Sequence, residues 1–220
     1  MLLERKMFVD FQSILTNLPY MLVTLAIAFT AHEYAHAYAA YKFGDPTAKN
    51  QGRLTLNPLV HIDPIGAIFI ILFGFGWAKP VPVNRFFFKN PRMNGIIVSI
   101  VGPLSNLALA VLAVLIVFLI QQFNLGMMIP DFMFKFFTIF ININVLLFVF
   151  NLLPFPPLDG YRIIEDLVKP DLRAKMTQYE QYGVLIFLIL VVTPLGQYTI
   201  DPILYNLVPS IVQTLYSILY

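Results

Sequence analysis

The sequence predicts an all-α protein that crosses a membrane several times. Of its 220 residues, 59% are hydrophobic and only 12% are charged, and the mean hydropathy is +0.77. This composition is too apolar for a soluble domain of this length. The polar stretches are short, so we expect a single domain over residues 1–220. Uncharged runs long enough to span a bilayer as helices lie at 11–31, 93–130, 136–158, 181–200 and 202–220.

The cysteine content and the net charge limit the metal ligands, nucleophiles and partners that this chain can have. The chain contains no cysteine and has a formal net charge of +2. The lack of cysteine excludes disulfide bonds, a thiolate nucleophile and cysteine-ligated metals, which leaves histidine and carboxylate groups as metal ligands. The small net charge gives no reason to expect a nucleic acid as partner. The apolar runs make the lipid bilayer the expected surroundings.

The first apolar run continues with helical periodicity into ThrAlaHisGluTyrAlaHisAlaTyr at 30–38, so we expect a helix over about 15–42. On this helix His32 and His36 lie one turn apart on one face, and Glu33 projects beside them. This HExxH spacing is typical of a zinc site with its own general base. Ionisable groups at bilayer depth cost on the order of 2.5–3.5 kcal/mol each, which favours a functional role over a structural one.

The region that follows contains a short apolar stretch, 62–78, bounded by prolines. Residues 53–59 alternate briefly and predict a short strand that ends in a turn. The stretch 62–78 is short for a span and is expected to be re-entrant. In that topology 11 of the 14 Lys and Arg residues lie on one side of the membrane, against 10 if the stretch spans. The positive-inside rule makes that side cytoplasmic, and the count favours re-entry only slightly.

Two long apolar helices are expected next, over about 93–121 and 132–153. The first contains GlyProLeuSerAsn at 102–106, whose small residues Gly102, Ser105 and Ala108 favour close helix packing. Asn106 could form a hydrogen bond towards the metal site or could serve packing alone. Two further helices are expected at the C-terminus, over about 181–200 and 203–220, with a break at Asp201 and Pro202.

The helix expected over about 132–153 ends in AsnLeuLeuProPheProProLeuAspGly at 151–160, where three prolines interrupt it. If 62–78 is re-entrant, this end emerges on the same side as the end of the HExxH helix. Asp159 could then supply the third protein ligand that catalytic zinc sites need. Taken alone, Asp159 could equally be the cap of a short helix over 160–168. His61, Asp45 and Asp63 are interpreted as loop and turn residues.

HisGluTyrAlaHis at 32–36 and the proline-rich motif at 151–160 together resemble the site-2 protease family of M50-type intramembrane zinc metalloproteases. The resemblance covers roughly residues 20–165. It implies a three-helix catalytic core, with GlyProLeuSerAsn on the middle helix, and a re-entrant or β-hairpin element within 53–83. The PDZ and CBS domains of some members have no room in this chain. The resemblance further implies that Zn²⁺ is held by His32, His36 and Asp159, that Glu33 activates the water, and that Asn151 contacts the substrate backbone or the oxyanion.

The same resemblance implies hydrolysis of peptide bonds within or near a transmembrane helix of a protein substrate. That helix must unwind locally, and an exposed strand edge within 53–83 could hold it by strand addition. A multi-pass protein of a prokaryotic plasma membrane, with its active site towards the cytoplasm, is expected. Two other classes stay open. A non-catalytic homologue would bind transmembrane clients without cutting them. A metal transporter would need ionisable groups along several helices, which 93–130 and 136–158 lack.

Overall fold

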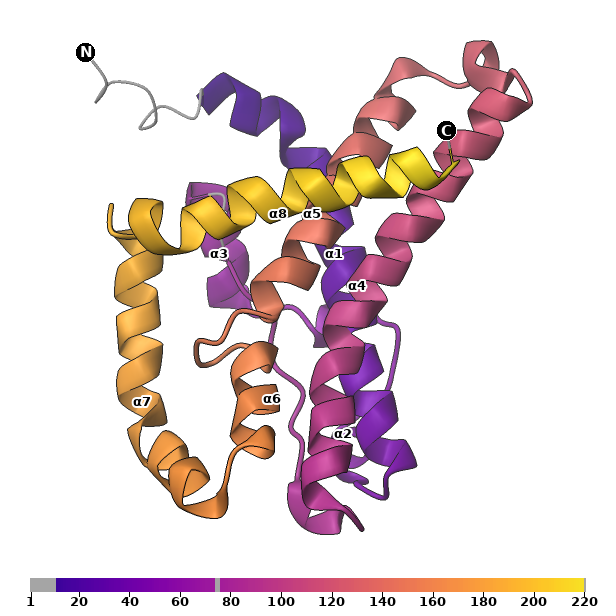
Figure 1. Cartoon of the computed structure of the whole chain (residues 1–220). Coiled ribbons are helices and arrows are strands. Elements are labelled where there is room, and N and C mark those ends of the chain that lie inside the picture. The colour runs from indigo at the N-terminus through magenta and orange to yellow at the C-terminus, as the bar shows by residue number, and fades with distance from the viewer. Residues whose placement is uncertain (1–10, 74–75, 220) are drawn as a thin grey trace.

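The computed structural model describes residues 11–73 and 76–219, and these residues form helices, turns and loops without a strand (Figure 1). The predicted all-α class is therefore confirmed. The elements in chain order are α1 (Phe11–Lys42), α2 (Thr47–Asn50), η1 (Pro58–Val60), α3 (Pro64–Phe73), η2 (Arg85–Phe87), α4 (Pro91–Gln122), η3 (Leu125–Met128), α5 (Asp131–Asn151), α6 (Asp159–Leu167), α7 (Pro170–Val192) and α8 (Gly196–Leu219).

Helices α1, α4 and α5 pack against one another in pairs and position the polar residues described below. Their bounds lie within a few residues of the helices expected at 15–42, 93–121 and 132–153. Helix α4 places Gly102, Asn106, Ala110 and Ala113 in its buried face. Small residues there allow the helices to approach closely. Ala108, which was expected to share this packing role with Gly102, is exposed instead.

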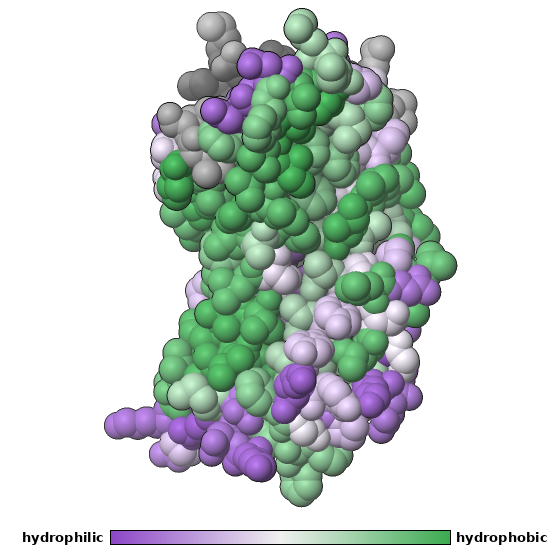
Figure 2. Space-filling model, turned by 90° about the vertical axis from the view of Figure 1, so that its right-hand side faces the viewer, coloured by the Kyte–Doolittle hydropathy of each residue, from purple (hydrophilic) through white to green (hydrophobic). Residues whose placement is uncertain are grey.

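Two helices of the described chain, α4 and α5, are long and apolar enough to cross a membrane. The outer face of α4 exposes large aliphatic side chains rather than polar ones. Figure 2 shows a hydrophobic surface over much of this side of the molecule, with hydrophilic side chains gathered mainly towards one end. Exposed apolar surface of this extent suits contact with lipid. The exposed aliphatic residues on α4 include Val111, Leu112, Leu115, Ile116 and Leu119.

The predicted strand at 53–59 is wrong, and no β-hairpin occurs among the described residues of 53–83. The side chain of Asn57 accepts a hydrogen bond from the backbone of Leu59 and starts η1 instead. The run 62–78 has no polar alternation, and Asp63 accepts hydrogen bonds from the first N–H groups of α3. A capped apolar run without alternation favours a helix over a hairpin.

Both ends of the stretch 62–78 meet, because Ile62 and Ala78 form an isolated antiparallel bridge. The ten-residue α3 lies between them. A helix of this length reaches about 15 Å, roughly half of the hydrocarbon thickness. Ala78 therefore lies next to the point from which the stretch starts.

The C-terminal helices have different bounds from those expected. Helix α7 begins at Pro170, inside the polar stretch, and the chain breaks at 193–195 rather than at Asp201 and Pro202. Pro194 lacks an N–H donor, whereas Pro202 lies inside α8. Helix α8 lies across α4 and α5, and α7 stands beside α6 on the side away from α4 (Figure 1). Packing of α8 on α5 and α4 sustains the helix past Pro202, because tertiary contacts override local preference.

Candidate metal centre

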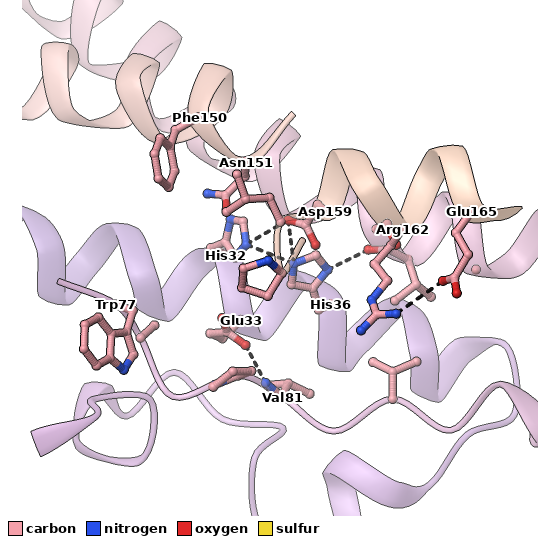
Figure 3. Close-up of a pocket in the computed structure, with 18 of the residues that line it drawn as sticks. His32, Glu33, His36, Trp77, Val81, Phe150, Asn151, Asp159, Arg162 and Glu165 are labelled. Carbon is pink, nitrogen blue, oxygen red and sulfur yellow. Dashed lines mark hydrogen bonds and ion pairs between the residues drawn. The ribbon is translucent and has the colours of Figure 1, made fainter. Parts of the chain in front are cut away.

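His32, His36 and Asp159 converge at one point between α1 and the start of α6 (Figure 3). The two Nε2 atoms are 2.9 Å apart. The Oδ2 atom of Asp159 lies 3.2 Å from Nε2 of His32 and 3.3 Å from Nε2 of His36. Both histidines are buried, with 7% and 8% of their surface exposed. The structure thus brings together three of the residues singled out in the sequence, across more than a hundred positions.

The other nitrogen of each imidazole faces an oxygen. His32 Nδ1 lies 2.8 Å from Oδ1 of Asn106, and His36 Nδ1 lies 2.6 Å from the carbonyl oxygen of Val98. A backbone carbonyl only accepts hydrogen bonds, so His36 donates from Nδ1. When Nδ1 carries the proton, the Nε2 atom of a neutral imidazole carries a lone pair. Asn106 therefore contacts the site, which resolves the two roles that its sequence position left open.

These donor atoms fit a zinc ion. The Oδ2 atom of Asp159 is buried and has no hydrogen-bond donor among the described residues. Lone pairs crowded at about 3 Å repel one another unless a cation lies between them. Ligand atoms about 2.0–2.1 Å from a tetrahedral zinc ion lie about 3.3 Å apart, close to the observed separations. Two imidazoles and one carboxylate also form a ligand set found in catalytic zinc enzymes.

The position of Asp159 is set by the loop that joins α5 to α6. Leu158 is the N-cap residue of α6, and the side chain of Asp159 forms no capping hydrogen bond. The carboxylate points towards the histidines instead, so capping does not explain it. Gly160 follows immediately, and a Cβ atom there would overlap the carbonyl groups of Leu152 and Leu153. The glycine thus allows α6 to start tightly against the end of α5.

Gly102 on α4 lies directly against the two histidines. A Cβ atom at this position would overlap Nε2 and Cε1 of His36 and would lie 2.9 Å from Cε1 of His32. The GlyProLeuSerAsn segment therefore serves the site as well as helix packing, because only glycine leaves room for both rings.

Gly102→Ala is expected to lower zinc affinity by at least the 10–100-fold typical of outer-shell changes, because the new methyl group displaces the imidazoles. Zinc affinity of the purified protein, measured by competition with a chelator, tests this. Ser105→Ala is the matched control, since the Ser105 hydroxyl bonds only to the carbonyl of Gly102 within its own helix. Equal affinities of the two variants would contradict the close contact at Gly102.

Glu33 lies next to His32 in sequence but points away from the three converging atoms (Figure 3). Its Oε2 atom accepts a hydrogen bond of 2.7 Å from the backbone N–H of Val81. The carboxylate is buried, with 7% of the residue exposed. The Glu33 carboxylate is therefore buried beside the centre but held outside the group of three converging residues.

An extended segment, residues 77–84, crosses the face of α1 that carries Glu33. The N–H of Lys79 donates to the carbonyl of His61, and the N–H of Asn84 donates to Oδ2 of Asp45. Asp45 also accepts from Thr47, so it acts as a turn residue and as an anchor for this segment. His61 is buried in the loop, bonds to the carbonyl of Thr55, and lies outside the group of three converging residues.

A cleft of about 860 Å³ runs over the three residues and the extended segment. Its walls include Trp77 and Val81 of the extended segment, Phe150 of α5 and Phe187 of α7. Asn151, the last residue of α5, also lines it, and its amide donates to the carbonyl of Leu147. Its volume lies within the 300–1,000 Å³ that is usual for ligand pockets.

An ionic network holds α6 against α7 and η2 at one end of this cleft. Arg85 bonds to Asp166 at 2.8 Å, and Arg162 bonds to Glu165 and Glu180. Burial acts to raise the pKa of Glu165, but the hydrogen bond from Thr177 and the charges of Arg162 and Arg85 outweigh it, so this pKa lies below its ordinary value of 4.5. Burial raises the pKa of Asp166 despite the neighbouring arginines.

On acidification, the Thr177→Val variant is expected to lose stability at a higher pH than the wild-type protein does. A lowered folded-state pKa means that the stabilisation from Glu165 is complete above about 4.5 and is lost as the pH falls through the lowered pKa. Removing the hydroxyl raises that pKa. Melting temperatures between about pH 3 and 6 test this, against Thr199→Val, whose hydroxyl bonds to the carbonyl of Leu195 just before α8. Superimposable curves would contradict the assignment.

Sequence reasoning missed Val81, Gly102 as a contact of the histidines, and Asn144. Asn144 is fully buried on α5 and bonds to Asn106. A polar residue in an apolar helix is a signal for such a role. The same helix also carries Asn142 and Asn151, however, and the sequence does not show which of the three faces the site.

Comparison with known proteins identifies the family. A family model described as "Peptidase family M50" matches residues 120–193, which include Asn151 and Asp159. The chain is 57% identical over 192 residues to a Bacillus subtilis protein named "Putative zinc metalloprotease YwhC", an alignment covering 86% of this chain and 88% of that protein. No solved structure gave a significant match.

More distant relatives carry the same description. The chain is 34% identical over 168 residues to Rip2 of Mycolicibacterium smegmatis, covering 74% of this chain and 62% of that protein. It is 30% identical over 145 residues to MJ0611 of Methanocaldococcus jannaschii, covering 66% and 68% of the two chains.

The YwhC alignment covers most of both chains, which is sufficient to assign the family. The relatives are named as zinc metalloproteases, and the described chain contains a His, His and Asp cluster that suits Zn²⁺, so zinc is the cofactor. Helices α4 and α5 agree with a membrane protein. This chain belongs to peptidase family M50, the site-2 protease family of zinc metalloproteases.

Proposed function

We propose that this protein is an intramembrane metalloprotease that hydrolyses peptide bonds within or near transmembrane segments of other proteins. The observation that carries the proposal is the convergence of His32, His36 and Asp159 beneath a cleft inside an apolar helix bundle. A water-filled cleft at that depth would admit the nucleophile that hydrolysis requires. The two apolar helices and the membership in family M50 support the same conclusion.

The proposed roles follow from the contacts. His32, His36 and Asp159 would hold the zinc ion, which when bound supplies a Lewis acid that makes water nucleophilic near neutral pH. Glu33 would accept the proton of the attacking water and deliver it to the leaving amine. The N–H of Val81 fixes the Glu33 carboxylate outside the ligand set. Asn151, on the wall of the cleft, would donate a hydrogen bond to the oxyanion or the substrate backbone.

We propose that the substrate chain binds alongside the extended segment 77–84. Ala78, Pro80, Val81 and Val83 line the cleft. Pro80 and Pro82 have no N–H group, so at these residues the segment can offer a docked chain only carbonyl acceptors. A substrate that donates its own N–H groups must first leave its helix, because helical N–H groups are already bonded.

The multi-pass topology, with the site towards the cytoplasm, is part of this proposal. The relatives named above come from two bacteria and an archaeon, which supports the cell membrane of a prokaryote as the location. The paired ends of 62–78 support a re-entrant path, which would place the ends of α1 and α5 on the same side of the membrane.

The test is cleavage in liposomes that contain the purified protein and a reporter with one transmembrane helix. Mass spectrometry of the products should place the cleaved bond within or beside the apolar segment. Gly or Pro near that bond should speed cleavage, and Leu should slow it, because unwinding precedes hydrolysis. Cleavage confined to the soluble parts of the reporter would reject the proposal. Gly or Pro variants that bind unchanged but are cut more slowly would reject the unwinding step.

A further inference from the structure

A chain of hydrogen bonds runs from His32 into the interior of the helix bundle. Oδ1 of Asn106 lies 2.8 Å from Nδ1 of His32. The amide nitrogen of Asn106 donates to the carbonyl of Ala28 and to Oδ1 of Asn144, each at 3.2 Å. The amide nitrogen of Asn144 donates to the carbonyl of Phe140 at 2.9 Å. Both asparagines are fully buried, so these bonds have no competition from solvent.

The two backbone carbonyls give this chain a direction. The carbonyl of Phe140 only accepts, so Asn144 must face it with its nitrogen and present its oxygen to Asn106. The carbonyl of Ala28 likewise requires the nitrogen of Asn106. Both amide protons of Asn106 are then used, and only its oxygen is left for His32. His32 must therefore donate from Nδ1.

We propose that Asn144 is a positioning residue, which acts through Asn106 to hold His32 with its proton on Nδ1 and its Nε2 lone pair directed at the metal. The inference rests on the proposed zinc site and adds to it. His36 needs no such help, because its Nδ1 faces the carbonyl of Val98 directly. His32 faces a side-chain amide, which could turn over and present its nitrogen instead.

Asn144 opposes that turn. If the Asn106 amide rotated by half a turn, its oxygen would face both the carbonyl of Ala28 and Oδ1 of Asn144. Buried acceptors facing one another lose their hydrogen bonds, which is costly where no water can replace them. The rotated amide would donate to Nδ1 of His32 and move the imidazole proton to Nε2. That proton would then occupy the position of the metal.

Asn144→Leu is expected to speed zinc loss to a chelator by about 10–100-fold in the purified full-length protein, the range typical of a lost outer-shell partner. Asn142→Leu is the matched control. Asn142 lies two residues earlier on α5, is exposed, and makes the same bond to the carbonyl four residues back, at 2.8 Å, without a contact to Asn106. Asn144→Asp should restore slow zinc loss, because a neutral carboxylic acid there can reproduce both bonds of the amide.

A second measurement needs no variant. The chain has only three histidines, so nitrogen NMR of histidine-labelled protein can identify the proton-bearing nitrogen of each ring. The zinc-free wild-type protein above neutral pH should show His32 with its proton on Nδ1, and Asn144→Leu should shift His32 towards the other tautomer. This readout also decides the matter if Asn144→Leu folds poorly, because a proton on Nε2 in the wild type overturns the inference.

The outcomes separate the two proposals. If the wild type binds zinc and Asn144→Leu loses it no faster than Asn142→Leu, the positioning role of Asn144 is wrong and the zinc site stands. If the wild type binds no zinc after reloading, the proposed site itself is wrong, and the inference falls with it. Faster loss in Asn144→Leu alone, reversed in Asn144→Asp, supports the inference.

Discussion

Glu33→Gln is expected to lower the rate of peptide hydrolysis by about 10²–10⁴-fold while about one zinc ion per chain is retained. The carboxamide has nearly the shape of the carboxylate and can still accept the hydrogen bond from Val81. It cannot accept a proton at neutral pH, however. Glu33 lies outside the group of converging ligand atoms, so its replacement should leave metal binding intact.

Reporter cleavage in liposomes and metal analysis of the same preparation measure both quantities. Asp171→Asn is the matched control, because it makes the same chemical change at an exposed carboxylate on α7. Cleavage at the wild-type rate by Glu33→Gln would rule out Glu33 as the base. Absence of cleavage in the wild type as well, with zinc bound, would indicate a homologue that binds clients without cutting them.

Asp159→Ala is expected to abolish both zinc retention and hydrolysis. Its carboxylate lies 3.2 and 3.3 Å from the two imidazole nitrogens and is the only carboxylate in the converging group of described residues. Loss of one of three protein ligands should weaken binding by more than the 10–100-fold that outer-shell changes cause. The remaining two histidines would hold the metal only weakly.

Zinc content after dialysis against a weak chelator measures this effect. Asp63→Ala serves as the control, since Asp63 caps α3 away from the centre. Zinc retained at the wild-type level in Asp159→Ala would mean that another residue supplies the third ligand. A variant that loses zinc but keeps hydrolysing the reporter would show that hydrolysis does not require the zinc ion.

The regions in which sequence reasoning failed have two different physical causes. A strand was expected at 53–59, but the side chain of Asn57 accepts a hydrogen bond from the backbone of Leu59 and starts η1 instead. The break between the last helices was expected at Asp201 and Pro202, but packing of α8 against α5 keeps Pro202 inside a helix. In the first region a local turn outweighed a brief alternation of residues, and in the second a tertiary contact outweighed a weak local preference.

The sequence by itself determined the apolar helices and the placement of His32, Glu33 and His36, because helix periodicity is local and fixes residues one turn apart on one face. It also marked Asp159, because prolines interrupt the helix before it. Only the tertiary structure decided that Asp159 meets the histidines, that Gly102 leaves room for them, and that Asn144 rather than Asn142 faces Asn106. Those facts depend on the rotation and depth at which α1, α4, α5 and α6 pack. Local sequence does not set either quantity, because helix packing admits several geometries.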